Sequence, residues 1–282
     1  MPKRIFRKIA LVFTLVAVTA IIALSGLPSG KLELIFLDVG QGDAILISTP
    51  DNHKVLIDAG PAGAILDPLA QELNFWERQI DLVILTHPDT DHIAGFVEVL
   101  KRYKIGQVLL TGVQHETEWY AEILRQIAEQ GITTTVANAA TDFDLGGGVL
   151  LDVFWPEENL AGRFVSDANA ASVSAKLIFG TTSAILTGDL DIESEKIILE
   201  SSPDLHAQIL KLGHHGSKTS SSQEFLAAVS PSYAVVSASA DNSFGHPSPE
   251  VLAKLPDAKI LETSKIGNIR FISDGQTWRT KN

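Results

Sequence analysis

The stretch His87-Pro88-Asp89-Thr90-Asp91-His92 places two imidazoles and two carboxylates within six residues. It follows the apolar run Leu82-Val83-Ile84-Leu85, which is typical of a buried strand, and it precedes a segment with helical spacing. Crowded carboxylates raise one another's pKa, whereas divalent ions favour the deprotonated form of every group present. The spacing lets His87 and Asp89 face one ion while Asp91 and His92 face a second. The stretch therefore predicts a two-metal site on a loop after a strand.

Helix capping is the alternative explanation for this stretch. Asp91 would then cap a helix that begins at His92, as aspartate commonly does. Capping leaves His87, Asp89 and His92 without a role, so metal binding is the better interpretation.

Further carboxylates and imidazoles follow three other apolar runs. Asp189 ends Leu186-Thr187-Gly188-Asp189, where the glycine permits the close approach that a bridging ligand needs. His214 and His215 follow the short run Gln208 to Leu210, and the sequence does not decide which of them is a ligand. Asp58 ends a third run and is expected to orient a ligand, to hold a bridging water or to cap a turn.

Composition limits the kinds of protein that this chain can be. Its 282 residues are 45% hydrophobic, enough for one large domain, which we place at residues 31–282. The formal net charge of −12 disfavours broad, charge-driven binding to nucleic acid. Cysteine is absent, so disulfides are excluded and any metal must be held by imidazole and carboxylate.

Residues 1–30 resemble a membrane anchor or a secretory signal. The uncharged run from Ile9 to Leu27 is about long enough to cross a bilayer, and a small-residue cleavage site is present at Ala23-Leu24-Ser25. A basic cluster precedes the run, on the side expected to stay cytoplasmic: Lys3, Arg4, Arg7 and Lys8. We favour an uncleaved anchor with an extracytoplasmic catalytic domain, and a secreted protein if the segment is cleaved.

The chain alternates strands and helices, and two of its segments follow the same pattern. Asp58 follows Ala44 by 14 residues and Asp189 follows Ala175 by 14, each at the end of a strand–turn–strand pattern. Chance similarity of hairpins is the alternative to two related halves. Related halves predict two mixed sheets packed face to face, with helices on both outer faces and the loop carboxylates along one edge.

These motifs resemble those of the metallo-β-lactamase superfamily. The stretch from Phe36 to Ala44 (Phe-Leu-Asp-Val-Gly-Gln-Gly-Asp-Ala) is similar to the opening of the soluble domain of the ComEC family of DNA-uptake proteins. The segments 169–172, 213–219 and 242–247 follow the order and spacing of that family. The resemblance implies a four-layer αβ/βα sandwich, an α/β fold, preceded here by one N-terminal hydrophobic helix. It also implies the metal ligands, namely His87, Asp89, Asp91, His92, Asp189 and His215.

The chain departs from the superfamily pattern at two positions. Asn169 stands where most members have a histidine, and Asp89 replaces another histidine. Both departures make the site rich in oxygen ligands, which shifts the preferred metals from zinc towards manganese or magnesium. We expect two divalent ions, zinc or manganese, and a phosphate ester rather than a lactam as substrate.

The expected reaction is metal-assisted hydrolysis by an activated water. Asp58 is expected to accept its proton, and Asn169, Ser217 and Lys218 to contact the substrate. His246, in a Gly-His-Pro turn, is expected to protonate the leaving group or position the substrate, with a purely structural turn as the alternative.

Three functions remain open from the sequence. The first is a phosphodiesterase or nuclease that acts on DNA, preferably single-stranded, outside the cytoplasmic membrane. The second is a hydrolase of a cell-surface phosphoester or a lactone, and the third is a non-catalytic, metal-stabilised DNA-binding module. A single apolar segment cannot form a channel, so we expect either a stand-alone anchored relative of the DNA-uptake proteins or a protein that works beside a separately encoded channel, and the sequence does not distinguish these.

Overall fold

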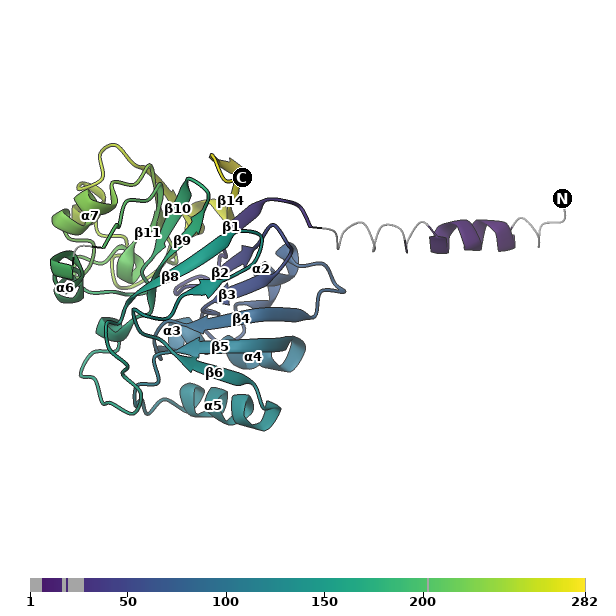
Figure 1. Cartoon of the computed structure of the whole chain (residues 1–282), viewed down its shortest axis with the longest axis horizontal. Coiled ribbons are helices and arrows are strands. Elements are labelled where there is room, and N and C mark those ends of the chain that lie inside the picture. The colour runs from purple at the N-terminus through teal and green to yellow at the C-terminus, as the bar shows by residue number, and fades with distance from the viewer. Residues whose placement is uncertain (1–6, 17–18, 20–27, 202, 282) are drawn as a thin grey trace.

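Two mixed β-sheets pack face to face in the computed structural model, which describes residues 7–16, 19, 28–201 and 203–281 (Figure 1). The first sheet has the order β15-β14-β1-β2-β3-β4-β5-β6 and the second has the order β13-β12-β11-β10-β9-β8-β7. The strands of the first sheet are β1 (Leu32–Phe36), β2 (Ile45–Ser48), β3 (Lys54–Ile57), β4 (Gln79–Leu85), β5 (Lys104–Leu110), β6 (Thr133–Val136), β14 (Ile269–Ser273) and β15 (Trp278–Lys281). Those of the second sheet are β7 (Phe143–Asp144), β8 (Val149–Trp155), β9 (Ser174–Phe179), β10 (Thr182–Leu186), β11 (Ile209–Lys211), β12 (Tyr233–Val236) and β13 (Lys259–Glu262).

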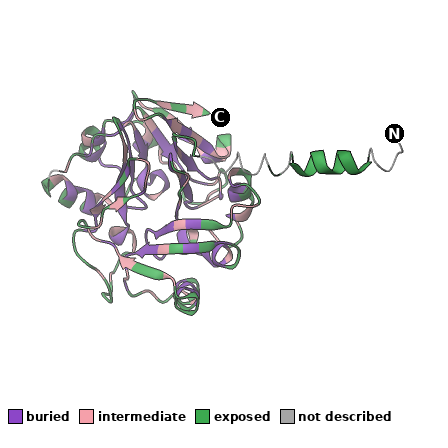
Figure 2. Ribbon diagram, turned by 45° about the vertical axis from the view of Figure 1, so that its right-hand side comes forward, coloured by how far each residue is buried: buried purple, intermediate pink, exposed green. Residues whose placement is uncertain are grey.

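Helices cover the outer faces of both sheets (Figure 2). The described helices are α2 (Leu66–Glu72), α3 (Thr90–Ile93), α4 (Phe96–Arg102), α5 (Glu118–Gln130), α6 (Ile192–Ser201), α7 (Gln223–Val229), α8 (Pro249–Leu252) and α9 (Thr263–Ile266), with 3-10 turns η1 (Asn169–Ala171) and η2 (Gly213–Gly216). Helix α5 shows why such a segment is helical. The Thr117 side chain caps its first turn, Ile123 and Ile127 form a buried stripe, and Gly131 ends it in a left-handed conformation.

Three hydrophobic clusters mark the three interfaces of a four-layer sandwich. One cluster lies between the sheets, the second between the first sheet and α2, α4 and α5, and the third between the second sheet and α6, α7 and α8. Strand β1 shows the alternation that this requires, because Leu34 faces the other sheet and Ile35 faces the helices, both fully buried or nearly so. The predicted two-sheet αβ/βα sandwich is confirmed.

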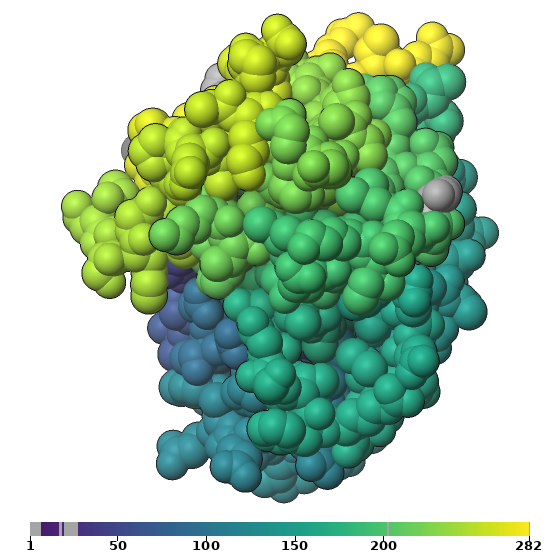
Figure 3. Space-filling model, turned by 90° about the vertical axis from the view of Figure 1, so that its left-hand side faces the viewer, coloured from purple at the N-terminus to yellow at the C-terminus, as the bar shows by residue number. Residues whose placement is uncertain are grey.

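The two halves of the chain repeat one strand arrangement. In β1 to β6 the first two pairings are antiparallel and the next three are parallel. The strands β8 to β13 pair in the same sequence. Figure 3 shows the later half, green to yellow, stacked above the earlier half, blue to teal. The topology supports the predicted relationship between the halves.

The predicted N-terminal hydrophobic helix lies largely outside the described residues. Residues 7–16 are helical and exposed, but much of the apolar run from Ile9 to Leu27 is not described. Among the described residues, we find no helix of the length and apolar character needed to span a bilayer.

Candidate metal centre

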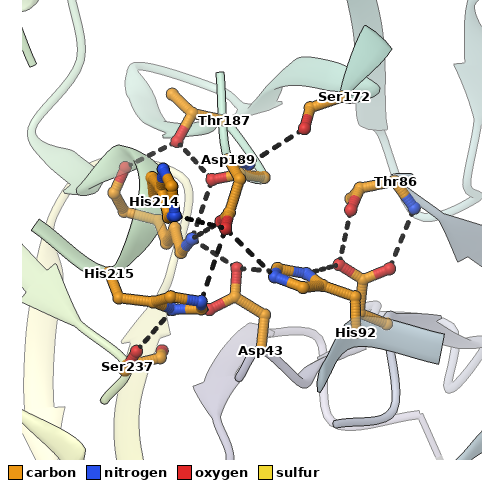
Figure 4. Close-up of polar contacts among 12 residues, drawn as sticks. Asp43, Thr86, His92, Ser172, Thr187, Asp189, His214, His215 and Ser237 are labelled. Carbon is orange, nitrogen blue, oxygen red and sulfur yellow. Dashed lines mark hydrogen bonds and ion pairs between the residues drawn. The ribbon is translucent and has the colours of Figure 1, made fainter. Parts of the chain in front are cut away.

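The predicted ligands meet at the edge where the strand-end loops of the two sheets face each other (Figure 4). Four buried side chains each offer one ligand atom, and these atoms lie within 4.8 Å of one another: Asp43, His92, Asp189 and His215. Three of the four were predicted as ligands from the sequence. Asp189 is central, since its Oδ2 lies 3.3 Å from His92 Nε2 and 3.4 Å from His215 Nε2.

The other three predicted ligands adjoin this group. The His87 ring lies 4.1 Å from the His92 ring, centroid to centroid, and His87 Nε2 lies 3.6 Å from Asp89 Oδ2. On the opposite side, Asp91 Oδ2 lies 3.2 Å from His215 Nε2. The fold thus brings all six predicted ligands into one continuous set of contacts, while their role as ligands stays a prediction. The Asp89 and Asp91 side chains are 39% and 37% exposed, so the site opens to solvent on their side.

Helix capping does not account for the acidic residues of the first motif. Helix α3 begins at Thr90, inside the motif, with Asp89 at the N-cap position. The Asp89 side chain accepts no hydrogen bond from the helix, and the Asp91 carboxylate contacts His215 instead. The side chains face the cluster and not the helix end.

The donor atoms of this cluster fit a divalent cation. His87 Nε2 and Asp43 Oδ1 are buried and have no hydrogen-bond partner among the described residues. An unpartnered buried polar atom costs roughly 1–3 kcal/mol, which a bound ion would offset. Imidazole nitrogen and carboxylate oxygen are ordinary ligands for zinc and manganese.

A second layer of hydrogen bonds fixes the imidazoles. Asp58 accepts hydrogen bonds from the Thr86 amide (2.8 Å) and the Thr86 hydroxyl (2.6 Å), and it lies 2.8 Å from His92 Nδ1. The Ser172 hydroxyl accepts from the Asp189 amide at 3.0 Å and lies 3.3 Å from His87 Nδ1. Such partners orient ligating histidines and raise their basicity. Asp58 is thus placed to orient His92, and its proposed role as proton acceptor stays a prediction.

His215, and not His214, lies inside the cluster, and its role as a ligand stays a prediction. The His215 side chain is 2% exposed, lies in the cluster and places Nδ1 2.8 Å from the Ser237 carbonyl oxygen. The His214 side chain is 29% exposed, and its Nε2 is 4.0 Å from Asp189 Oδ2. Both residues have the left-handed backbone that is costly for a non-glycine residue, with φ of 46° and 55°. The strained backbone of this turn therefore sets the direction of both side chains.

Asp43 was missed by the sequence analysis, although it lies in the quoted stretch from Phe36 to Ala44. It reaches the cluster because Gly42, with φ of 122°, lets its loop lie against the first motif. A Cβ atom at Gly42 would overlap the carbonyl oxygen of Asp91. An acidic residue directly after a glycine-rich turn was the available signal.

Lys211 was also missed, and it is the cation beside the cluster. Its ammonium pairs with the Asp43 carboxylate and lies 3.3 Å from Asp189 Oδ1. Burial lowers the pKa of Lys211, but these two carboxylates outweigh burial and raise it, so the side chain stays charged.

The electrostatics of the cluster favour a cation. Burial raises the pKa of Asp189, but His215, His92 and Lys211 outweigh it and hold that pKa well below its usual range. Burial likewise lowers the pKa of His215, but the carboxylates of Asp189, Asp43 and Asp91 raise it to about 9. The carboxylates thus favour the protonated form of the neighbouring imidazole. A bound divalent ion would supply positive charge in place of that proton.

The predicted substrate-contacting residues lie at different depths around the cluster. Asn169 opens η1, and its Oδ1 is buried without a hydrogen-bond partner among the described residues. The Ser217 hydroxyl is buried against the Thr219 hydroxyl at 3.0 Å, and Lys218 is exposed. Their contacts to substrate stay predictions.

His246 borders the cluster on the His214 side. The two rings are 5.5 Å apart, and the exposed Phe244 ring stacks on His246 at 5.8 Å with an interplanar angle of 25°. The Asn242 side chain holds this loop by accepting from the His246 amide and donating to the His246 carbonyl oxygen. The turn is thus structured around His246, whose catalytic role stays a prediction.

A groove of about 1080 Å³ begins at Asp89. It runs between the loop after β5, the start of α5 and the segment 164–168. His115 stands in it with Nε2 3.7 Å from Asp89 Oδ1, and the Phe164 side chain is largely exposed at its rim. The sequence analysis did not single out His115, because the residue stands alone in a loop without a recognisable motif.

Two mixed sheets that bring imidazoles and carboxylates together at one loop edge define a class of metal-dependent hydrolases. The family model of the metallo-beta-lactamase superfamily matches residues 37–240, and the chain belongs to that superfamily. The chain is 32% identical over 248 residues to competence protein ComA of Neisseria gonorrhoeae and 28% identical over 264 residues to ComE operon protein 3 of Bacillus subtilis. Each match covers 86% of this chain but 33% of the relative.

One solved structure supports the assignment of the fold. The metallo-beta-lactamase fold protein YhfI from Bacillus subtilis superposes with a TM-score of 0.58 over 86% of this chain and 100% of that one, at 10% identity. At such low identity the likeness concerns the fold alone. The resemblance noted in the sequence is confirmed at the level of the superfamily and of its competence-related members.

Proposed function

We propose that this protein is a phosphodiesterase that hydrolyses single-stranded DNA with the help of divalent metal ions. The observation that carries the proposal is the oxygen-rich cluster, in which Asp43, Asp89, Asp91 and Asp189 surround three imidazoles. Hard oxygen ligands suit manganese or magnesium and the phosphate esters that these ions activate. The competence proteins among the relatives support DNA as the substrate, although this chain spans only a third of their length.

The charges of the site support two ions. Once bound metal has displaced the protons of the imidazoles, five aspartates, at positions 43, 58, 89, 91 and 189, are offset within the site by Lys211. Two divalent ions would balance the remaining four negative charges. A bound ion of this kind supplies an activated water and stabilises charge on the attacked phosphoryl group.

Residues of the chain orient a ligand, mark the side from which the substrate enters and contact the substrate. Asp58 fixes His92, and the partly exposed Asp89 and Asp91 mark the side from which substrate enters. Buried Asn169 Oδ1 and His246 Nδ1 have no hydrogen-bond partner among the described residues, and they can contact the substrate as predicted. Burial and the neighbouring His214 and His215 lower the pKa of His246, which favours the neutral imidazole and therefore a role in positioning the substrate over one as proton donor.

The groove beside Asp89 limits the nature of the substrate. Its described lining contains Asp89, Glu116 and Asp167 and neither lysine nor arginine, so it does not attract a phosphate chain. Its exposed Phe164 offers a ring on which a base can stack. We place the phosphate at the metal cluster and an uncharged base in the groove. The same lining favours a small phosphodiester as the second candidate substrate.

The location stays part of the proposal. The basic residues and the apolar run within residues 1–30 support a domain that acts outside the cytoplasmic membrane, either anchored or released by cleavage.

A substrate panel tests the proposal. The full chain is loaded with Mn²⁺, Mg²⁺ or Zn²⁺ and assayed on a single-stranded oligonucleotide, bis(p-nitrophenyl) phosphate, a lactone and a β-lactam, with Asp189→Asn as control. We expect metal-dependent cleavage of the oligonucleotide that the control lacks. Turnover of only the small phosphodiester, the lactone or the lactam would replace DNA as the substrate. Retention of DNA without cleavage, unchanged in the control, would identify a binding module instead.

A further inference from the structure

Lys211 is a lysine with no exposed side-chain surface, at the end of β11. Its ammonium pairs with Asp43 Oδ2, lies 3.3 Å from Asp189 Oδ1 and donates to the Gly188 carbonyl oxygen at 2.8 Å. An ammonium has three donors, and these three acceptors account for them. Because the side chain has no exposed surface, Lys211 acts through the groups to which it bonds.

Burying the Lys211 ammonium costs free energy, which indicates that the residue has a function in the protein. Removing an ammonium from water costs several kcal/mol, which only close and well-oriented acceptors offset. Its two carboxylates come from loops far apart in the chain, Asp43 after β1 and Asp189 after β10. Lys211 therefore ties the two halves together directly beside the candidate metal centre.

Each carboxylate uses one oxygen for Lys211 and has the other beside an imidazole of the cluster. Asp43 Oδ1 has no hydrogen-bond partner among the described residues and lies 3.5 Å from His215 Nδ1. Asp189 Oδ2 lies within 3.4 Å of both His92 Nε2 and His215 Nε2. The lysine thus fixes the rotation of both side chains and leaves each with one oxygen for a metal.

We infer that Lys211 is a positioning residue that acts as a built-in cation of the metal centre. It holds Asp43 and Asp189 as one-oxygen ligands before the metal binds, and it offsets one of the negative charges that the imidazoles and ions would otherwise have to balance. This inference rests on the proposed metal-dependent function and assigns a role to a residue outside the predicted ligand set.

Two effects of removing Lys211 have opposite signs. Loss of a positive charge beside the cluster would strengthen the binding of a divalent ion, whereas loss of orientation would weaken it. The ammonium contacts both carboxylates directly, whereas the other described neighbour of Asp43 Oδ2, His92 Nδ1, lies 3.8 Å away, so we expect the loss of orientation to dominate.

The test is a double-mutant cycle read out by metal affinity. Mn²⁺ is titrated calorimetrically into metal-stripped wild type, Lys211→Met, Asp43→Asn and the double variant. We expect each single variant to bind at least tenfold more weakly, and the double variant to bind about as weakly as either single one. Affinity that is unchanged or increased in Lys211→Met, or effects that multiply in the double variant, would overturn the inference.

Lys176→Met provides the matched control. Lys176 is a buried lysine of the same sheet, but its ammonium bonds to Asp204. Its loss is expected to lower the melting temperature and to leave Mn²⁺ affinity unchanged, so a general effect of buried lysines on folding is separated from positioning. If Lys211→Met fails to fold by near-ultraviolet circular dichroism, Lys211→Gln is titrated in its place and judged by the same criterion.

The titration also separates this inference from the proposed function. Wild-type protein that binds neither Mn²⁺ nor Zn²⁺ would overturn both. Wild-type protein that binds Mn²⁺ with Lys211→Met binding equally well would overturn only the role of Lys211.

Discussion

Asp58 and Asp189 occupy equivalent positions in the two halves of the molecule, but their side chains have different roles. Each follows the second strand of a central hairpin, β3 in one sheet and β10 in the other. Asp58 accepts two hydrogen bonds from Thr86 and faces His92 Nδ1, on the side of the ring away from the cluster. Asp189 turns one oxygen to the Nε2 atoms of His92 and His215. The fold supplies the position, and the neighbouring side chains decide the role.

The loops that follow the next two strands of each half can be compared in the same way. The first motif follows β4, and the His214–His215 turn follows the equivalent strand β11. His115 follows β5, and His246 follows the equivalent β12. The loop after β5 borders a groove with an acidic lining, whereas the loop after β12 carries the stacked pair of His246 and Phe244. The predictions below test how far the halves differ.

The largest expected effect belongs to the central carboxylate. Asp189→Asn removes the charge that two imidazoles share, so we expect kcat to fall roughly 10³-fold, about 4 kcal/mol, with loss of bound metal. Elemental analysis and oligonucleotide cleavage measure the two effects. A variant that keeps both metal and activity would show that Asp189 is not the shared ligand.

Metal removal tests whether the ions join the two halves. The ligands come from both halves, so an ion that binds only the folded chain stabilises it by about 2.7 kcal/mol at a concentration of 100 times Kd. We expect EDTA to lower the melting temperature by roughly 5–10 °C, and Mn²⁺ to restore it. An unchanged melting temperature in calorimetry would contradict a metal shared between the halves.

The equivalent substitution in the first half is expected to cost less. Asp58→Asn keeps an acceptor for Thr86 but loses the charge that orients His92, which typically costs about 10- to 100-fold in metal affinity or activity. Comparison with Asp189→Asn in the same assays measures the difference between the two positions. Equal losses at both positions would show that Asp58 is itself a ligand or the proton acceptor.

The smallest effect is expected at the exposed aromatic rings. Phe164→Ala removes the ring at the rim of the groove and should raise KM for a single-stranded oligonucleotide about five- to tenfold, with kcat nearly unchanged, because one stacked base contributes about 1–3 kcal/mol. Phe244→Ala is the matched variant, because it removes the exposed ring beside His246. A larger effect on KM from Phe244→Ala would place the bases over His246 and not in the groove.

Local patterns were sufficient for the elements that carry the first motif. The apolar run Leu82-Val83-Ile84-Leu85 was expected to be a buried strand and lies in β4 (Gln79–Leu85), because its composition is a local property. The strands β13 to β15 were not anticipated. Strand β14 pairs with β1 across more than 200 residues, and no local pattern can report such a partner.

The candidate site divides in the same way. His87, Asp89, Asp91 and His92 were visible because their crowding within six residues needs a cation, whatever the fold. Asp43 and Lys211 are single residues in separate segments. Their significance comes from the contact between them, which exists only when the two halves are assembled.

The sequence by itself determined the class of chemistry, since a chain without cysteine that concentrates imidazoles and carboxylates after apolar strands is built to bind metal through nitrogen and oxygen. Only the tertiary structure decided which oxygen of each carboxylate faces the cluster, that His215 and not His214 lies inside it, and that a lysine completes it. The physical reason is that residue types and spacing are local properties, whereas burial, orientation and the balance of charge depend on which loops the two sheets bring together.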